Sequence, residues 1–109
     1  MIHVKQGDRQ PAAPATINKG GVAVSLEDAA SITFKMRLKS QMHLTAEGAA
    51  TIVDAPNGVV EYRWAEGDTD MAGDFYASWV VTWSDGTQET FPTIHYDLIR
   101  IDANLTGTV

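Results

Sequence analysis

The stretch Gly73-Asp74-Phe75-Tyr76-Ala77-Ser78-Trp79-Val80-Val81-Thr82-Trp83 decides the fold of this chain of 109 residues. Every second residue from Phe75 to Trp83 is apolar, and a period of two describes a β-strand with one face buried in a core. The intervening positions carry Tyr76 and Val80, so the second face is also partly apolar. We therefore predict a central strand over residues 73–83, with Trp79 and Trp83 on its core side.

Shorter stretches on the N-terminal side repeat the alternation. Residues 31–38 switch strictly between polar and apolar, and Val60, Tyr62 and Trp64 alternate with polar neighbours. Asn57-Gly58 and Asp85-Gly86 lie between such runs, and these dipeptides are strong hairpin signals. The pattern predicts strands near residues 2–5, 14–18, 22–25, 31–38, 50–54, 58–64, 73–83, 87–91 and 94–101.

Many short strands with frequent turns predict an all-β fold, and at this length an immunoglobulin-like antiparallel β-sandwich of about seven to nine strands fits best. We expect one domain over residues 1–103, followed by a flexible C-terminal tail over residues 104–109. The residues that we expect to define this fold are Phe34, Tyr62, Trp64, Asp70, Gly73, Phe75, Trp79 and Trp83.

The composition narrows the range of possible functions. The chain has 14 acidic and 8 basic residues, a net charge of -6, which argues against nonspecific binding to nucleic acid. The absence of cysteine excludes disulfides and cysteine zinc sites. The first residues lack the apolar core of a signal peptide, and no apolar run reaches the length of a membrane span. We expect folding in a cytoplasm and neither a nucleic-acid nor a membrane partner.

The charge is unevenly distributed along the chain. Residues 1–43 hold six basic and three acidic residues, whereas residues 44–109 hold two basic and eleven acidic ones. The two parts could form patches of opposite sign that guide contacts between identical subunits. Alternatively, strands from both parts interleave in the sandwich and the charges neutralise each other.

The segment Asp68-Thr69-Asp70-Met71-Ala72-Gly73-Asp74 has two interpretations. Asp68, Asp70 and Asp74 could be ligands of a calcium ion, although the spacing departs from an EF-hand. We prefer a polar turn whose carboxylates bind backbone N–H groups, and we expect no cofactor. The same segment resembles the approach to the penultimate strand of immunoglobulin-type domains, but Phe75 stands where their tyrosine corner needs a phenol.

Recognised catalytic motifs are missing from the sequence, so we expect no enzymatic activity. Contacts with other proteins are the remaining possibility. Ile2, Val4 and Lys5 could pair with the sheet edge of a neighbouring subunit, although we prefer that they form the chain's own first strand. Tyr76 and Tyr96 are the aromatic residues that we expect to be exposed.

Several stretches, taken in order, resemble one known family. These are residues 4–8 (VKQGD), 26–37 (LEDAASITFKMR), 53–64 (VDAPNGVVEYRW), 68–77 (DTDMAGDFYA) and 83–92 (WSDGTQETFP). Together they are similar to the N-terminal domain of the baseplate upper protein family of tailed bacteriophages, and the similarity covers about residues 3–101.

This resemblance implies a non-enzymatic structural protein of a phage or phage-like particle, made in the host cytoplasm and located in the virion. Its partners would be other virion proteins in the tail, baseplate, neck or head, and it would occur in several copies or as a homo-oligomer. A module that binds carbohydrate or the host surface, or a capsid decoration protein, is the alternative.

Overall fold

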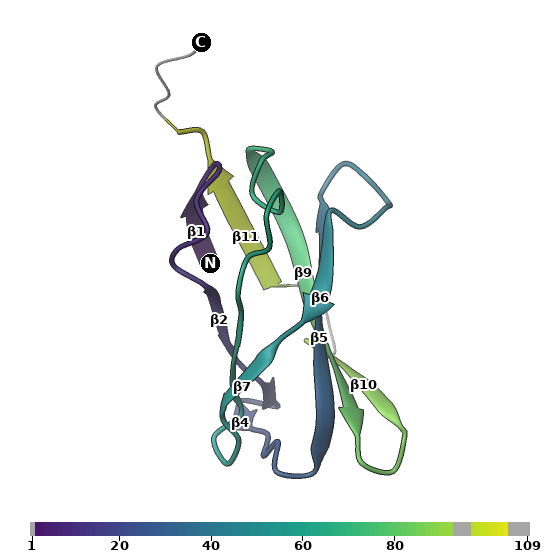
Figure 1. The fold of residues 1–109 in the computed structure, drawn as a ribbon. Helices are drawn as coiled ribbons and strands as arrows, with labels where there is room; N and C mark the ends of the chain where they lie inside the picture. Colours follow the sequence, from purple (N-terminus) through teal and green to yellow (C-terminus); the bar gives the residue numbers. More distant parts are fainter. Residues whose placement is uncertain (1, 93–96, 105–109) are drawn as a thin grey trace.

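The computed structural model describes residues 2–92 and 97–104 (Figure 1). In that part of the chain the regular elements are all β-strands, and no helix is long and apolar enough to cross a membrane. The all-β sandwich predicted from the alternating pattern is therefore confirmed.

The larger sheet contains the strand that decides the fold. Its order is β1-β11-β9-β5-β6, and β10 pairs with the far end of β9. The six strands are β1 (Ile2–Lys5), β5 (Ala29–Leu38), β6 (Ala46–Ala49), β9 (Gly73–Trp83), β10 (Gln88–Phe91) and β11 (Asp97–Asp102). As predicted, β9 is central, because it pairs along its length with β5 on one side and with β10 and β11 on the other.

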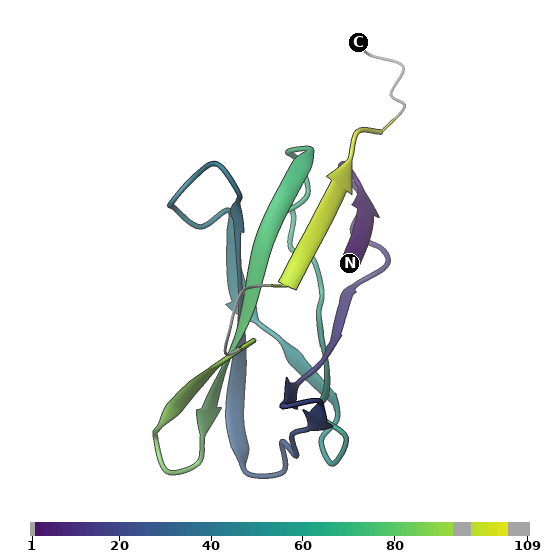
Figure 2. The same cartoon turned by 180° about the vertical axis from the view of Figure 1, so that it is seen from behind.

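The smaller sheet has the order β2-β8-β7 and packs against the larger one (Figures 1 and 2). Its strands are β2 (Ala13–Thr16), β7 (Thr51–Asp54) and β8 (Val59–Tyr62), and a short hairpin of β3 (Asn18–Lys19) and β4 (Val22–Ala23) lies beside it. β6 and β7 belong to one extended stretch that passes from the larger sheet to the smaller one. Ala50, between them, donates its N–H to the carbonyl of Ile32 at 2.8 Å.

The strand order is that of an immunoglobulin-like domain. The strands β11, β9, β5 and β6 correspond to G, F, C and C′, whereas β2, β8 and β7 correspond to B, E and D. β1 pairs in parallel with β11, Val4 opposite Ile101, so the N-terminal segment forms the chain's own first strand, as we preferred.

An aromatic cluster joins the two sheets. Phe34 of β5 stacks on Tyr62 of β8 with ring centroids 4.3 Å apart, and Trp64 and Trp79 contact Phe34 edge-on. All four side chains are buried, as is Phe75. Trp83, expected in the core, is only partly buried at its margin, since β9 there reaches the end of the sandwich.

The structure differs from the sequence-based prediction in three details. Val4, a candidate for an exposed interface, is 4% exposed because its alternation places it opposite Ile101 on the core side. The strand β6 was not predicted, since Ala-Glu-Gly-Ala has neither alternation nor β-branched residues. The described part of the chain holds eleven strands, more than seven to nine, because the stretch 46–54 divides between two sheets and the two-residue β3 is separate from β2.

The expected tail and the last predicted strand lie partly outside the described residues. β11 begins at Asp97, and residues 94–96, Tyr96 among them, are outside the described ranges, as are residues 105–109. Asn104, assigned to the tail, donates its side-chain amide to the carbonyl of Gln6 at 3.2 Å.

The turn between β7 and β8 depends on Gly58. Its φ is +70°, a conformation that residues with a Cβ rarely adopt. An added Cβ would lie 2.5 Å from the carbonyl oxygen of Val24 and 2.9 Å from that of Ile17. The Gly58 carbonyl also accepts the N–H of Ile17 at 2.8 Å, so this turn joins β8 to the β3–β4 hairpin.

Comparing Gly58→Ala with an alanine substitution at a second glycine of positive φ separates the cost of the clash from the cost of the backbone conformation. Gly20 has a φ of +60° and nothing within 4 Å of an added Cβ, so Gly20→Ala is the matched control. We expect Gly20→Ala to lower the free energy of unfolding by about 1 kcal/mol. Because backbone atoms must also move, we expect Gly58→Ala to cost about 3 kcal/mol. Urea unfolding measures both, and equal losses would show that the close approach is harmless.

Candidate functional site

The outer face of the larger sheet carries the most concentrated set of interaction-prone side chains. Phe75 and Ala77 face the core, so Tyr76 between them faces outward, beside Arg37 of β5. The Arg37 guanidinium carbon lies 5.1 Å from the centroid of the Tyr76 ring, and the Lys39 ammonium nitrogen lies 5.3 Å from it. Both distances are within cation–π range. Tyr76, predicted to be exposed, is half-buried by these contacts.

Apolar side chains extend this surface onto the loop between β5 and β6. Met42 is 87% exposed and Leu44 is 43% exposed. A shallow hollow of about 90 Å³ lies between Leu44, Tyr76 and the adjoining parts of β5 and β9. Arg37 donates to the carbonyl of Gln41 at 2.7 Å, which ties the loop to the sheet. We name this surface the Tyr76 face, and it comprises Lys35, Arg37, Lys39, Met42, Leu44 and Tyr76.

The Tyr76 face has a positive charge at its centre. Three cations come from β5 and the residue that follows it, and Glu47 of β6 lies opposite Lys35, with 3.8 Å between nitrogen and oxygen. Tyrosine and arginine are among the residues that contribute most to protein interfaces, and methionine adapts to varied partner shapes. The chemistry of this surface therefore suits a protein partner that presents carboxylates around an apolar patch.

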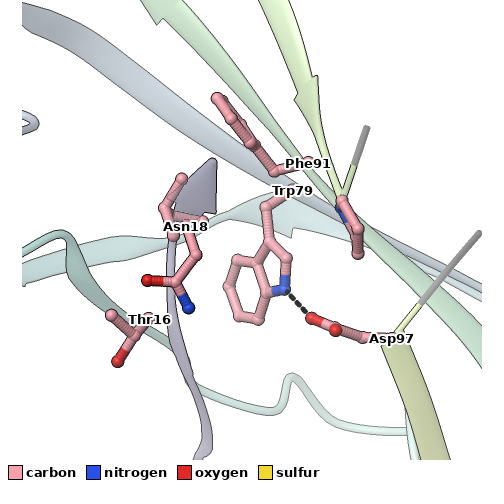
Figure 3. Close-up of a pocket in the computed structure, with 7 residues that line it drawn as sticks. Thr16, Asn18, Trp79, Phe91 and Asp97 are labelled. Atoms are coloured by element: carbon pink, nitrogen blue, oxygen red, sulfur yellow. Dashed lines mark hydrogen bonds between the residues drawn. The ribbon is translucent and has the colours of Figure 1, made fainter. Parts of the chain in front are cut away.

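A second hollow lies at the open side of the sandwich, and its volume is about 220 Å³. Figure 3 shows the indole of Trp79 at its floor, where the ring nitrogen donates to a carboxylate oxygen of Asp97 at 2.9 Å. Thr16, Asn18 and Phe91 line the remaining sides. Among the lining residues that the structure describes, Asp97 is the titratable one. Its carboxylate accepts the indole N–H of the buried Trp79, which would otherwise lack a hydrogen-bond partner. The described lining therefore contains no second titratable side chain that could form an acid–base pair with Asp97.

The structure does not bring the three candidate metal ligands together. Asp68 accepts the Tyr62 hydroxyl at 2.6 Å and the Ala65 N–H at 2.9 Å. Asp74 accepts Arg100 at 3.0 Å, and Asp70 is exposed. Across residues 2–92 and 97–104 no group of three His, Asp or Glu side chains could hold a metal ion. The arrangement corresponds to a polar turn.

The hydrogen bond from Tyr62 to Asp68 was not anticipated. Phe75 cannot donate the bond of a tyrosine corner, but Tyr62, on the preceding strand, closes the loop before β9 through Asp68. Burial and the adjacent carboxylate raise the pKa of Tyr62 well above its ordinary value of 10.0. A tyrosine in a strand that is followed six residues later by an aspartate could have predicted this bond, because a loop of that length can bring the carboxylate back to the phenol.

The N-terminal segment after β1 is bound to the same loop. Thr69, buried at 2% exposure, donates its hydroxyl to the carbonyl of Asp8 at 2.8 Å. Arg9 donates to the carbonyl of Trp64 at 2.9 Å, and the Trp64 indole donates to that of Pro11 at 3.0 Å. These bonds hold the exposed residues 8–11 against the loop, so the buried Trp64 contributes to the stability of the domain.

Part of the uneven charge along the sequence is neutralised by pairs between strands. Lys19 forms an ion pair with Glu89 at 2.8 Å, Lys35 lies near Glu47, and His3 lies 3.7 Å from Asp102. In each pair the basic residue comes from residues 1–43 and the acidic one from residues 44–109. Lys5, an exposed interface candidate on β1, also lowers the pKa of Asp102, after the larger effect of Arg100. Pairing between strands from the two parts of the chain accounts for this partial neutralisation.

Neither the protein-family models nor the curated proteins contain a match to this chain. The motif resemblance to the phage family is therefore an expectation that rests on the sequence motifs themselves.

Replacing Tyr62 by phenylalanine removes the bond to Asp68 and retains the stacked ring. We expect a loss of about 1–2 kcal/mol at neutral pH. Because folding raises the pKa of Tyr62, the stability from this bond is complete below about pH 10 and declines at higher pH. Urea unfolding at about pH 8 and about pH 10.5 should therefore show a smaller alkaline loss in Tyr62→Phe than in wild type.

Tyr76→Phe is the control, since it removes a tyrosine hydroxyl from the outer face. We expect this variant to retain the alkaline loss of wild type. An identical loss in all three proteins would contradict the assigned role of Tyr62.

Proposed function

We propose that this protein is a non-enzymatic structural component of a tailed-bacteriophage or phage-like particle. It is held in the tail, baseplate, neck or head by contacts of the Tyr76 face with neighbouring virion proteins. The observation that carries the proposal is the combination on one sheet surface of Tyr76, two cations against its ring, and the exposed Met42 and Leu44. The order of sequence motifs shared with the phage family supplies the particle context.

The physical argument concerns how such a surface binds. Arg37 and Lys39 hold Tyr76 in place, so little conformational entropy is lost when a partner covers the ring. Apolar side chains on the adjoining loop provide area that gains free energy on leaving water. In a particle that contains many copies, several weak contacts of this kind act together and become strong.

Binding of carbohydrate is the competing function. A sugar ring would stack on an exposed aromatic face, and Tyr76 is the aromatic residue of the Tyr76 face. Arg37 and Lys39 already lie against this ring, so a sugar would have to displace them. This arrangement favours a protein partner with carboxylates, which would keep both cations in place and pair with them.

The direct test is to purify intact particles from cells that carry the gene and to measure this chain by quantitative mass spectrometry. We expect a fixed copy number for each particle and density for an immunoglobulin-like domain in a cryo-electron microscopy map. Tyr76→Ala combined with Leu44→Ser should reduce incorporation at least about tenfold, because hot-spot truncations cost about 2 kcal/mol or more.

Arg63→Ala, which changes an exposed cation outside the Tyr76 face, is the matched control and should be incorporated like wild type. Circular dichroism of each purified variant establishes that it folds. If purified particles lack the chain while the cell extract contains it as a free monomer, the proposal is wrong. Binding on a glycan array that Tyr76→Ala abolishes would favour the carbohydrate alternative.

A further inference from the structure

One end of the sandwich is acidic. Figure 1 shows that the segment before β5, the turn between β7 and β8 and the turn between β9 and β10 lie at the same end. Hydrogen bonds join them, since Ser84 donates its N–H to the backbone carbonyl of Asp28 at 2.9 Å and Leu26 donates its N–H to that of Ala55 at 2.8 Å. We name this surface the acidic end, and its carboxylates are Glu27, Asp28, Asp54 and Asp85.

The cation of the β3–β4 hairpin is already paired. Lys19 of β3 bonds to Glu89 of β10 at 2.8 Å, so the two charges cancel. Thr87 donates its hydroxyl and its N–H to Asp85 and lowers the pKa of that carboxyl, which therefore stays ionised. The acidic end also carries apolar side chains, because Val53 beside Asp54 is 56% exposed and Val22 of β4 is 69% exposed.

The Tyr76 face has the opposite properties. It is positive, it includes Met42 and Leu44, and its loop lies at the other end of β5 (Figure 1). The same molecule therefore carries two surfaces of opposite charge, each with exposed apolar side chains. Opposite charges steer association and fix the relative orientation of partners, whereas apolar contact supplies the free energy.

We propose that the partner of the Tyr76 face is the acidic end of a second copy of this chain. Each copy then uses one surface for the copy before it and the other for the copy after it. Such a contact is heterologous, so repetition produces a ring or an open row. This inference rests on the proposed function, because it names the partner of the same surface, and it requires contact between neighbouring copies in the particle.

A charge exchange between two variants tests the head-to-tail contact. The first variant carries Lys35→Glu and Lys39→Glu, which makes the Tyr76 face acidic. The second carries Glu27→Lys, Asp28→Lys and Asp85→Lys, which leaves Asp54 as the remaining carboxylate and makes the acidic end basic. All five positions are on the surface of the domain, so both variants should fold, and thermal unfolding followed by circular dichroism checks this.

We expect wild type to self-associate in sedimentation velocity at high protein concentration and low salt. Raising the salt from about 50 mM to about 500 mM should weaken the association about tenfold or more. Each charge-reversed variant should remain monomeric by itself, since both of its surfaces then have the same sign. The equimolar mixture should regain the assembly, because every Tyr76 face again meets an end of opposite charge.

The matched control is Glu66→Lys with Asp70→Lys. It reverses two exposed carboxylates in the loop before β9, at the opposite end of the sandwich. We expect this variant to associate like wild type. Assembly that is lost in the control as well would indicate an effect of net charge alone.

Two results would overturn the inference. One is a wild-type protein that stays monomeric at low salt and high concentration, and the other is a mixture of the two variants that fails to associate although wild type does. Neither result affects attachment to a particle, which mass spectrometry of purified particles tests separately. Conversely, if the chain assembles in solution but is absent from purified particles, the head-to-tail contact stands and the proposed role in a particle is wrong.

Discussion

The stacking of Phe34 on Tyr62 is the interaction on which the rest of the structure depends. Phe34 belongs to the larger sheet and Tyr62 to the smaller one, and their rings lie 4.3 Å apart and nearly parallel. Gly48 of β6 makes this possible, because an added Cβ would stand 3.1 Å from the Tyr62 ring. Trp64 and Trp79 then close around Phe34 edge-on. A chain without disulfides thus joins its two sheets by aromatic contact, and the hydroxyl of Tyr62 extends the same contact to the loop before β9.

The orientation of the Tyr76 face follows from this core. Because Phe34, Met36 and Phe75 must face inward, their neighbours Lys35, Arg37 and Tyr76 must face outward from adjacent strands. The antiparallel register sets Arg37 opposite Tyr76, and β5 continues into the loop that carries Met42 and Leu44. A shift of one residue in the pairing of β5 with β9 would separate the cation from the ring. The candidate site is therefore a consequence of core register, which explains how a surface without a deep cavity can still be well defined.

Alternation was sufficient to predict β9 with its bounds, the outward position of Tyr76 and the hairpins at Asn57-Gly58 and Asp85-Gly86. Three features depend on contacts between distant residues, which a local pattern cannot contain. β6 has weak propensity and exists because β5 offers it an edge. Val4 is buried because β1 pairs with β11, almost a hundred residues later. The set of Asp68, Asp70 and Asp74 looked like a cation loop, but Tyr62 and Arg100 bind two of these carboxylates from other strands.

The separation of charge along the sequence has its explanation in this topology. In the larger sheet β1 lies beside β11, and β5 lies between β9 and β6, so some basic residues of the first part have acidic neighbours from the second, as Lys35 has Glu47. Turns have no such neighbours, because each turn protrudes from the end of the sandwich. The carboxylates of Glu27, Asp28 and Asp85 in turns, and of Asp54 at the last position of β7, therefore keep their charge, and the excess of cations on β5 keeps the opposite one. A molecule with a positive surface on one sheet and a negative surface at one end is complementary to a second copy, and this complementarity favours head-to-tail contact over symmetric pairing.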